Sequence, residues 1–323
     1  MDNNLLEVRN LTVAFEIEEG SFKAVDNISF NIKKGEILGL VGESGCGKSV
    51  TAMSILKLLP SPPAKFENGE ILFKNKNLLG MNSKELQGIR GKDISMIFQE
   101  PLSSLSPLRT IADQMIETIN LHRQITHKKA WKIVENWLKK VKIPDASHKM
   151  SAYPFQLSGG MRQRVMIAMA LMLNPNLIIA DEPTTALDVT VQAQIFELMR
   201  ENRQDTTSIF LITHDMGVIW DMCDRVIVMY ASKIVEEGTL NDIFKSPSHP
   251  YTKGLLDSIP KSIKKRERLT SIPGNVPSPF NYPQGCHFSD RCPYVFERCK
   301  IEDPKFINNT ETHKVACFKP LVT

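Results

Sequence analysis

Apolar and polar residues alternate along the first thirty positions of the chain. The apolar members of this pattern are Leu6, Val8, Leu11, Val13 and Phe15, followed by Ile28, Phe30 and Ile32. A period of two places every second side chain on the same face of an extended strand, so the pattern predicts antiparallel strands. A compact apolar run from Glu36 to Val41 comes next and predicts a buried strand.

Four more short apolar runs predict buried strands further along the chain. They span Ile94–Phe98, Leu177–Ala180, Ile209–Ile212 and Val226–Met229. Helical patterns separate several of these runs, and this alternation is typical of an α/β fold with a largely parallel central sheet.

The strand pattern disappears between about Pro101 and Leu157. The apolar residues in this stretch instead recur at helical spacing: Trp131, Val134, Leu138 and Val141. Because Lys and Glu fill the positions between them, we expect core packing in a helical subdomain at about residues 101–160.

Proline becomes frequent after about Ser246. The prolines are Pro247, Pro250, Pro260, Pro273, Pro277, Pro279 and Pro283. Since proline fixes φ and removes a backbone donor, this region predicts loops and not another layered sheet. We therefore predict a main domain at residues 1–250 and a small, loop-rich C-terminal extension at residues 251–323.

Composition and charge are those of an ordinary folded protein. The chain has 323 residues, of which 42% are hydrophobic and 24% charged, and its formal net charge is +4. These values exclude wholesale disorder, and the charge is too small to indicate a nucleic-acid partner. The most apolar run, Val165 to Leu173, is about half the length that a membrane span needs, so it predicts a buried helix.

A glycine-rich loop follows the predicted strand at residues 36–41. Its residues fit the P-loop pattern and are Gly42, Glu43, Ser44, Gly45, Cys46, Gly47, Lys48 and Ser49, with Val50 after them. Such a loop turns successive backbone N–H groups toward phosphates, helped by the helix N-terminus that follows. We expect Lys48 to reach the β- and γ-phosphates of ATP and Ser49 to offer its hydroxyl to Mg²⁺. Cys46 is most simply a small filler.

Three polar residues close two of the other predicted strands. Asp181 and Glu182 end one strand, and His214 follows another. Solvated acids at a strand end would be an alternative for the first pair. Beside a P-loop, however, Asp181 is the expected indirect Mg²⁺ partner, and Glu182 is placed to polarise the attacking water as general base. His214 falls where a γ-phosphate sensor is needed.

The segment Leu157–Arg164, which reads LSGGMRQR, resembles the signature sequence of the ABC ATPase family. The order of P-loop, Gln99, signature, Asp181-Glu182, Ala186-Leu187-Asp188 and His214 matches that family over about residues 5–240. The resemblance implies an α/β P-loop NTPase fold. Its parts are a RecA-like core, an N-terminal antiparallel β subdomain and a helical subdomain, with residues 1–250 as the nucleotide-binding domain.

The resemblance also implies that two cassettes face each other head to tail. Each ATP then lies between the P-loop of one chain and Ser158, Gly159 and Gly160 of the other. Small residues at a helix N-terminus suit this role because they approach a phosphate closely and offer it N–H groups.

Further residues receive roles from the same resemblance. Gln99 is implied to contact Mg²⁺ and the attacking water, and Asp188 is implied to lie in the nucleotide-contacting set. An aromatic residue near the N-terminus is implied to stack on adenine. Phe15 is the first choice and Phe22 the second, although both fit equally well as core residues.

Four stretches resemble one branch of the family, the dipeptide and oligopeptide importer ATPases. They read LSGGMRQRVMIAMAL from Leu157, ADEPTTALDVTVQAQI from Ala180, HPYTKGLL from His249 and GCHFSDRCP from Gly285. ATP hydrolysis coupled to peptide transport is thus implied. A nickel or other small-solute importer, and a non-transport ABC ATPase acting as a regulatory module, are the alternatives.

This resemblance implies a set of partners and a location. A second homologous ATPase would pair with the chain under two transmembrane permease subunits, while an extracytoplasmic binding protein delivers the substrate. The chain itself would be a peripheral subunit at the cytoplasmic face of the cell membrane.

Four cysteines cluster near the end of the sequence: Cys286, Cys292, Cys299 and Cys317. Disulfides fit a cytosolic ATPase poorly. A [4Fe-4S] cluster, a Zn²⁺ site and free thiols remain open from the spacing. The importer resemblance implies the cluster, which we expect to staple the loop-rich C-terminal extension, with zinc as the alternative.

Overall fold

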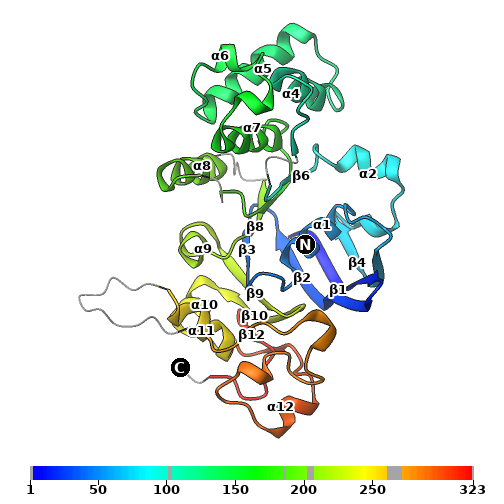
Figure 1. Ribbon diagram of the computed structural model, residues 1–323, viewed down its shortest axis with the longest axis vertical. Coiled ribbons are helices and arrows are strands. Elements are labelled where there is room, and N and C mark those ends of the chain that lie inside the picture. The colour runs from blue at the N-terminus through cyan, green and yellow to red at the C-terminus, as the bar shows by residue number, and fades with distance from the viewer. Residues whose placement is uncertain (1–2, 101–103, 185–186, 202–206, 260–270, 322–323) are drawn as a thin grey trace, which may run out of the picture. The chain divides into compact units, whose positions relative to one another are not determined.

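The computed structural model describes residues 3–100, 104–184, 187–201, 207–259 and 271–321 (Figure 1). The chain divides into two compact units. The first, called the helical unit here, comprises Met1–Leu5, Lys33–Gly35 and Gly80–Leu211, and the second, called the P-loop unit, comprises Leu6–Ile32, Glu36–Leu79 and Ile212–Thr323.

An antiparallel sheet opens the P-loop unit. Its order is β2-β1-β4-β5, formed by β1 (Asn4–Ile17), β2 (Gly20–Lys33), β4 (Ala64–Phe73) and β5 (Lys76–Asn77). In the register of β1 with β4, Leu6 lies opposite Phe73 and Phe15 opposite Ala64. The apolar positions Leu6, Val8 and Val13 are buried, which confirms the strands that their alternation predicts.

A second group of strands in this unit positions the P-loop. Its order is β11-β12-β10-β9-β3, formed by β3 (Ile37–Val41), β9 (Arg225–Tyr230), β10 (Lys233–Thr239), β11 (Ile307–Asn308) and β12 (Lys314–Val315). Strands β3 and β9 run parallel, with Leu40 opposite Ile227. All five residues of β3 are buried, as its continuous apolar run predicts. In the part of this unit that the structure describes, the helices are α1 (Lys48–Ile55), α9 (Met216–Met222), α10 (Leu240–Lys245), α11 (Pro250–Asp257) and α12 (Glu297–Ile301).

The helical unit combines short buried strands with a group of packed helices (Figure 1). The strands are β6 (Ile94–Ile97), β7 (Leu177–Asp181) and β8 (Ser208–Ile212), and β6 and β7 are parallel. Within its described ranges the unit carries the helices α2 (Ser83–Ile89), α4 (Ile111–Asn120), α5 (His127–Lys140), α6 (Ala146–Lys149), α7 (Gly159–Leu171) and α8 (Val189–Glu201). Val134 and Leu138 of α5 are fully buried, so the helical spacing correctly predicts a helical core.

The C-terminal extension consists mainly of loops, as its prolines predict. After α11, its described regular elements are short: the 3₁₀ turns Pro279–Asn281 and Ser289–Arg291, helix α12 (Glu297–Ile301), and strands β11 and β12. Strand β12 pairs with β10, where Val315 lies opposite Glu236, so the extension adds strands to the P-loop unit. A domain boundary at residue 250 stays a prediction.

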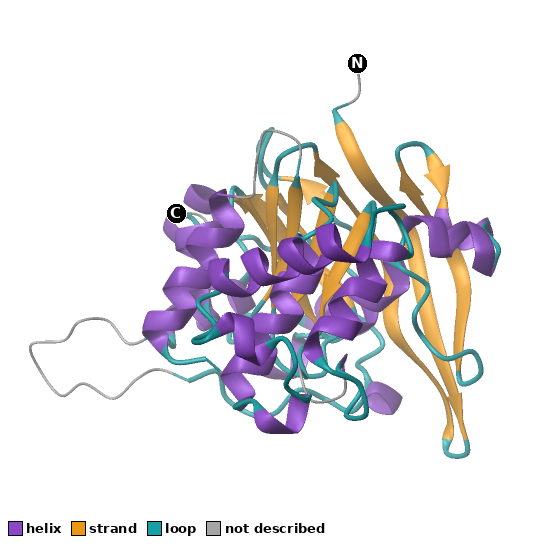
Figure 2. Cartoon of the chain, turned by 90° about the horizontal axis from the view of Figure 1, so that it is seen from above, coloured by secondary structure: helices purple, strands orange, loops and turns teal. Residues whose placement is uncertain are grey.

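Figure 2 distinguishes the helices from the strands by colour. None of the helices in the described ranges is long and apolar enough to cross a membrane. The apolar run from Val165 lies in α7 and the turn after it, where most of its side chains are buried.

Candidate functional site

The P-loop connects β3 to α1 in the P-loop unit. Gly47 ends the loop with a φ of 106°, a left-handed conformation that glycine adopts without strain. A Cβ on Gly47 would lie 2.3 Å from the carbonyl oxygen of Ala24, and one on Gly42 would lie 2.1 Å from that of Met229. The glycines are therefore required by close backbone neighbours as well as by the turn.

Lys48 turns its side chain back into the loop. The side chain is buried, and Nζ donates hydrogen bonds to the carbonyl oxygens of Gly42 at 2.8 Å and Glu43 at 2.9 Å. A cation held inside a ring of backbone groups is a prepared site for phosphate oxygens. Ser49 follows in the first turn of α1, and Cys46 is fully buried, as a filler would be. Burial raises the pKa of the Cys46 thiol, so it stays neutral.

The carboxylates of the helical unit lie at the end of β7. Asp181 is the last residue of this strand and is only 2% exposed. Glu182 follows with a φ of 46°, a left-handed conformation that is uncommon outside glycine. Gln99 follows β6, and its Nε2 donates a hydrogen bond to Glu182 Oε2 at 3.1 Å. The parallel pairing of β6 and β7 thus brings together two residues that the sequence analysis selected separately.

A third residue, which the sequence analysis did not select, holds the segment after Glu182. Gln163 of α7 is fully buried, and its Nε2 donates a hydrogen bond to the carbonyl oxygen of Pro183. Little in the sequence indicates this role, because Gln163 lies between Arg162 and Arg164 in a polar stretch of the segment.

The signature residues form the N-terminus of α7. Ser158 is the N-cap, and its Oγ accepts a hydrogen bond from the Met161 N–H at 3.3 Å. Ser158 and Gly159 are exposed, and a Cβ on Gly159 would meet no atom within 4 Å. The helix N-terminus is therefore open to an approaching anion.

Asp188 and His214 take positions at helix starts. Asp188 Oδ1 accepts a hydrogen bond from the Val191 N–H at 3.0 Å, which caps α8. Its neighbour in the motif, Ala186, lies outside the described residues. His214 is exposed between β8 and α9. The helical unit contains Gln99, Ser158, Asp181 and Asp188. The P-loop unit contains the P-loop itself and His214.

The two candidates for the adenine contact lie against each other. The rings of Phe15 and Phe22 are stacked, with centroids 5.8 Å apart and an interplanar angle of 15°. Phe280 of the C-terminal extension adds a third ring. It meets the Phe22 ring edge-on, with the two ring centroids 5.0 Å apart. Phe15 and Phe22 are both partly exposed, so this aromatic group presents surface on which a base can stack.

The four clustered cysteines line one pocket of the C-terminal extension. Its walls also carry the rings of Phe288, Tyr294, Phe296 and Phe318. All four cysteines lie in the described part of the chain as free thiols, and each is partly exposed.

The prediction of a [4Fe-4S] cluster at Cys286, Cys292, Cys299 and Cys317, or of zinc in its place, is wrong. Among the residues that the structure describes, no group of three or more Cys, His, Asp or Glu side chains is arranged to hold a metal ion. Burial raises the pKa of Cys286 to about 12 and that of Cys317 to about 11.

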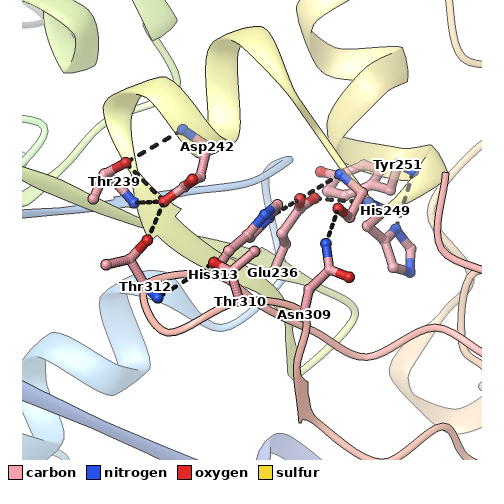
Figure 3. Close-up of polar contacts among 10 residues, drawn as sticks. Glu236, Thr239, Asp242, His249, Tyr251, Asn309, Thr310, Thr312 and His313 are labelled. Carbon is pink, nitrogen blue, oxygen red and sulfur yellow. Dashed lines mark hydrogen bonds and ion pairs between the residues drawn. The ribbon is translucent and has the colours of Figure 1, made fainter. Parts of the chain in front are cut away.

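A buried carboxylate links the C-terminal extension to strand β10 within the P-loop unit (Figure 3). Glu236 of β10 is fully buried and accepts hydrogen bonds from the N–H groups of Ser248, at 2.6 Å, and His249, at 2.9 Å. His313 Nε2 of the extension lies 2.7 Å from Glu236 Oε1. His249 in turn caps α11, because its Nδ1 accepts a hydrogen bond from the Tyr251 N–H at 3.0 Å.

Two family models match the chain. The model described as "ABC transporter" matches residues 25–185, and the model described as "Oligopeptide/dipeptide transporter, C-terminal region" matches residues 235–299.

Similar proteins cover nearly the whole chain. The dipeptide transport ATP-binding protein DppD of Bacillus subtilis (strain 168) is 50% identical over 97% of this chain and 94% of its own length. The oligopeptide transport ATP-binding protein AppD of the same organism is 47% identical over 98% of this chain and 97% of its own length. A solved dimeric ATP-binding cassette in a post-hydrolysis state, bound to ADP and Pi, has 30% identity and a TM-score of 0.67. That match covers 73% of this chain and 98% of the cassette.

These matches agree with the P-loop around Lys48, the Gln99–Glu182 pair and the signature helix. The chain therefore belongs to the ABC transporter ATP-binding family, and it carries the C-terminal region of the oligopeptide/dipeptide transporters.

Proposed function

We propose that this chain is the subunit that binds and hydrolyses ATP in an ABC importer of dipeptides or oligopeptides. The observation that carries the proposal is the buried Lys48 ammonium, held inside the P-loop by two backbone carbonyls. The substrate class is supported by the C-terminal region match and by the dipeptide and oligopeptide transport names of the relatives.

The P-loop amides and Lys48 bind the phosphates of ATP. Ser49, Asp181 and Gln99 would hold Mg²⁺ when it is bound, because hydroxyl, carboxylate and amide oxygens are the hard donors that this ion prefers. When bound, Mg²⁺ neutralises phosphate charge that develops during hydrolysis. Phe15 stacks on the adenine, with Phe22 as the second choice.

Glu182 is the general base. It accepts a proton from the attacking water, and the hydrogen bond from Gln99 Nε2 orients its carboxylate for this task. The exposed His214 contacts the γ-phosphate. Catalysis then consists mainly of positioning and charge stabilisation, as is usual for phosphoryl transfer.

Two cassettes act together in this proposal. Ser158, Gly159 and Gly160 complete the ATP site of a second, homologous ATPase, and Asp188 joins the nucleotide-contacting set. The dimeric state of the solved cassette supports this arrangement. Two transmembrane permease subunits bind the pair at the cytoplasmic face of the membrane, and an extracytoplasmic binding protein supplies the peptide.

A Glu182→Gln variant tests the proposal in the assembled complex. We expect it to retain ATP binding and to lose most ATP turnover, while Glu197→Gln, an exposed change on α8, retains both. Near-normal hydrolysis by Glu182→Gln would remove Glu182 from its role. Hydrolysis in the wild-type complex that responds to nickel and not to peptides, or recovery of the chain with soluble partners only, would overturn the peptide-importer function.

A further inference from the structure

Two residues of the C-terminal extension contact Glu43, the second residue of the P-loop. The Tyr251 hydroxyl accepts a hydrogen bond from the Glu43 backbone N–H at 2.9 Å. Arg291 Nη1 donates to Glu43 Oε2 at 2.8 Å, and this ion pair is largely shielded from water, with side-chain exposures of 7% for Arg291 and 26% for Glu43. All three residues belong to the P-loop unit. The extension thus holds both the main chain and the side chain of one P-loop residue.

Arg291 is itself fixed by contacts with other parts of the unit. Its Nε donates to the carbonyl oxygen of Pro273 at 2.9 Å, and Nη1 also lies 3.4 Å from the Tyr230 hydroxyl. Because these contacts use several donors of one planar guanidinium, they set the direction from which the side chain meets Glu43.

Tyr251 is held as firmly as Arg291. It is fully buried, and its ring lies against those of Tyr230 and Phe288, with centroid distances of 4.6 Å and 5.4 Å. Its backbone N–H is bound by His249, which Glu236 anchors (Figure 3). Burial also raises the pKa of the Tyr251 hydroxyl, so that it stays neutral beside the loop.

We propose that the C-terminal extension is a working part of the nucleotide site, in which Arg291 and Tyr251 are positioning residues that set the P-loop through Glu43. The proposal rests on the function proposed above, in which the P-loop binds ATP. It gives the extension a role in nucleotide affinity in addition to any role as a structural appendage.

Two physical effects support this role. First, the hydrogen bond to Tyr251 and the ion pair to Arg291 fix the peptide of Glu43, and with it the backbone of the loop whose amides bind phosphate. Second, Glu43 places a carboxylate in a loop that must accept a strongly anionic ligand. Pairing with Arg291 offsets this negative charge, so removing Arg291 would leave a repulsive charge near the phosphates.

The experiment measures MgATP affinity of the purified full-length chain, and KM and kcat of the assembled complex. Arg291→Met should weaken MgATP binding and raise KM about tenfold, while kcat at saturating ATP changes less than about threefold. Arg291→Lys keeps the charge and should recover part of the affinity. Arg298→Met is the matched control, because Arg298 lies in the same extension but pairs with Glu302 at the exposed surface. It should leave KM near the wild-type value.

Measuring the MgATP affinity of Arg291→Met in a chain that also carries Glu43→Gln tests whether Arg291 acts through Glu43. If it does, adding Arg291→Met to Glu43→Gln should change the affinity less than about twofold. A full tenfold loss in that background, or unchanged affinity in Arg291→Met itself, would overturn the proposal. Equal losses in Arg298→Met and Arg291→Met would also overturn it, since they would indicate general damage to the extension. Lys48→Met separates the two proposals: if it binds MgATP as tightly as the wild-type chain, ATP binding at the P-loop is refuted as well.

Discussion

Gln163 of the signature helix donates a hydrogen bond from its buried amide to the backbone carbonyl of Pro183, the residue after Glu182. The contact lies within the helical unit and joins α7 to the segment that carries the proposed general base. Glu182 has a left-handed backbone, a conformation that persists where neighbouring contacts hold it in place. Ser158 is the N-cap of the same helix, so α7 connects the signature residues with the segment that follows Glu182.

A Gln163→Leu variant should therefore hydrolyse ATP about tenfold more slowly or worse, with KM for ATP changed less than about twofold. Leucine keeps the volume but removes the donor, so the Glu182 segment loses its anchor, and small misplacements of a reacting group are costly. Steady-state ATPase assays on the assembled complex give both constants. Gln194→Leu, an exposed change on α8, is the control. An unchanged kcat in Gln163→Leu would show that this contact does not position Glu182.

The Gln163 contact illustrates what the sequence could predict and what it could not. The strands at β6, β7, β8 and β9 follow from apolar runs, because burial on both faces leaves a continuous local pattern. The P-loop and the acidic pair were likewise recognisable as local motifs. Arg291 and Glu43, in contrast, are 248 positions apart, and no local pattern links them.

The four clustered cysteines show that a sequence pattern can also predict a site that the structure does not have. From Cys286, Cys292, Cys299 and Cys317 the sequence analysis predicted a metal site, whereas the structure shows four thiols that line one pocket without the arrangement of a metal site in the described residues. Spacing does not determine where each sulfur points or what else lines the pocket. Aromatic rings share its walls, and burial raises the pKa of the Cys286 and Cys317 thiols.

A Ser158→Arg variant tests the head-to-tail arrangement. The exposed N-terminus of α7 would then carry a long side chain where a partner's nucleotide is proposed to bind. We expect ATP hydrolysis by the complex to fall at least tenfold, while the variant chain alone binds MgATP as tightly as the wild type. Ser158→Ala serves as the control, because it removes the cap, a loss of about 1 kcal/mol, without filling the space. If ATP binding by the variant chain itself collapsed, the assignment of Ser158 to the partner's site would fail.

Substitutions at Phe15 test whether this residue contributes to binding of the adenine base and not to binding of the phosphates. Stacking on a base contributes about 1–3 kcal/mol, so Phe15→Ala should weaken ATP binding about tenfold or more. Inorganic triphosphate has no base, and its affinity should be the same for Phe15→Ala and for the wild-type chain. Phe15→Tyr is the conservative control. An ATP-specific loss in Phe22→Ala and not in Phe15→Ala would transfer the adenine contact to Phe22.

Breaking the buried ion cluster at Arg225 should strongly destabilise the P-loop unit. The guanidinium bonds to Glu36 Oε1 at 2.8 Å, to Glu237 and to the carbonyl oxygen of Asn31, and its side chain is only 13% exposed. Arg225→Met would leave two buried carboxylates without this partner, which we expect to lower the free energy of unfolding by about 3–5 kcal/mol.

Chemical denaturation of full-length protein measures this loss. Arg9→Met is the matched control, because Arg9 pairs with Glu7 at the surface, where its side chain is 54% exposed. An exposed pair contributes at most about 1 kcal/mol. Similar losses in the two variants would contradict a special role for the buried cluster.

His249 should make the stability of the chain depend on pH. Burial lowers its pKa from 6.5 to about 4, although the nearby Glu236 acts in the opposite direction. As pH falls below 6.5, the unfolded chain therefore binds a proton that the folded chain excludes. The contribution of His249 is fully present above about pH 7 and is lost as pH falls toward 4. Because of this proton uptake by the unfolded chain, the free energy of unfolding should be about 2 kcal/mol lower at pH 5 than at pH 8.

A His249→Asn variant isolates this contribution. Asparagine is a good N-cap residue that does not titrate, so it can replace the bond to the Tyr251 N–H while removing the proton uptake. Denaturation curves at pH 5 and pH 8 should show a pH-dependent difference about 2 kcal/mol smaller than in the wild type, even if the variant is less stable at both pH values. His148→Asn, at an exposed site, should keep the wild-type difference. An unchanged difference in His249→Asn would contradict the assignment of this pH dependence to His249.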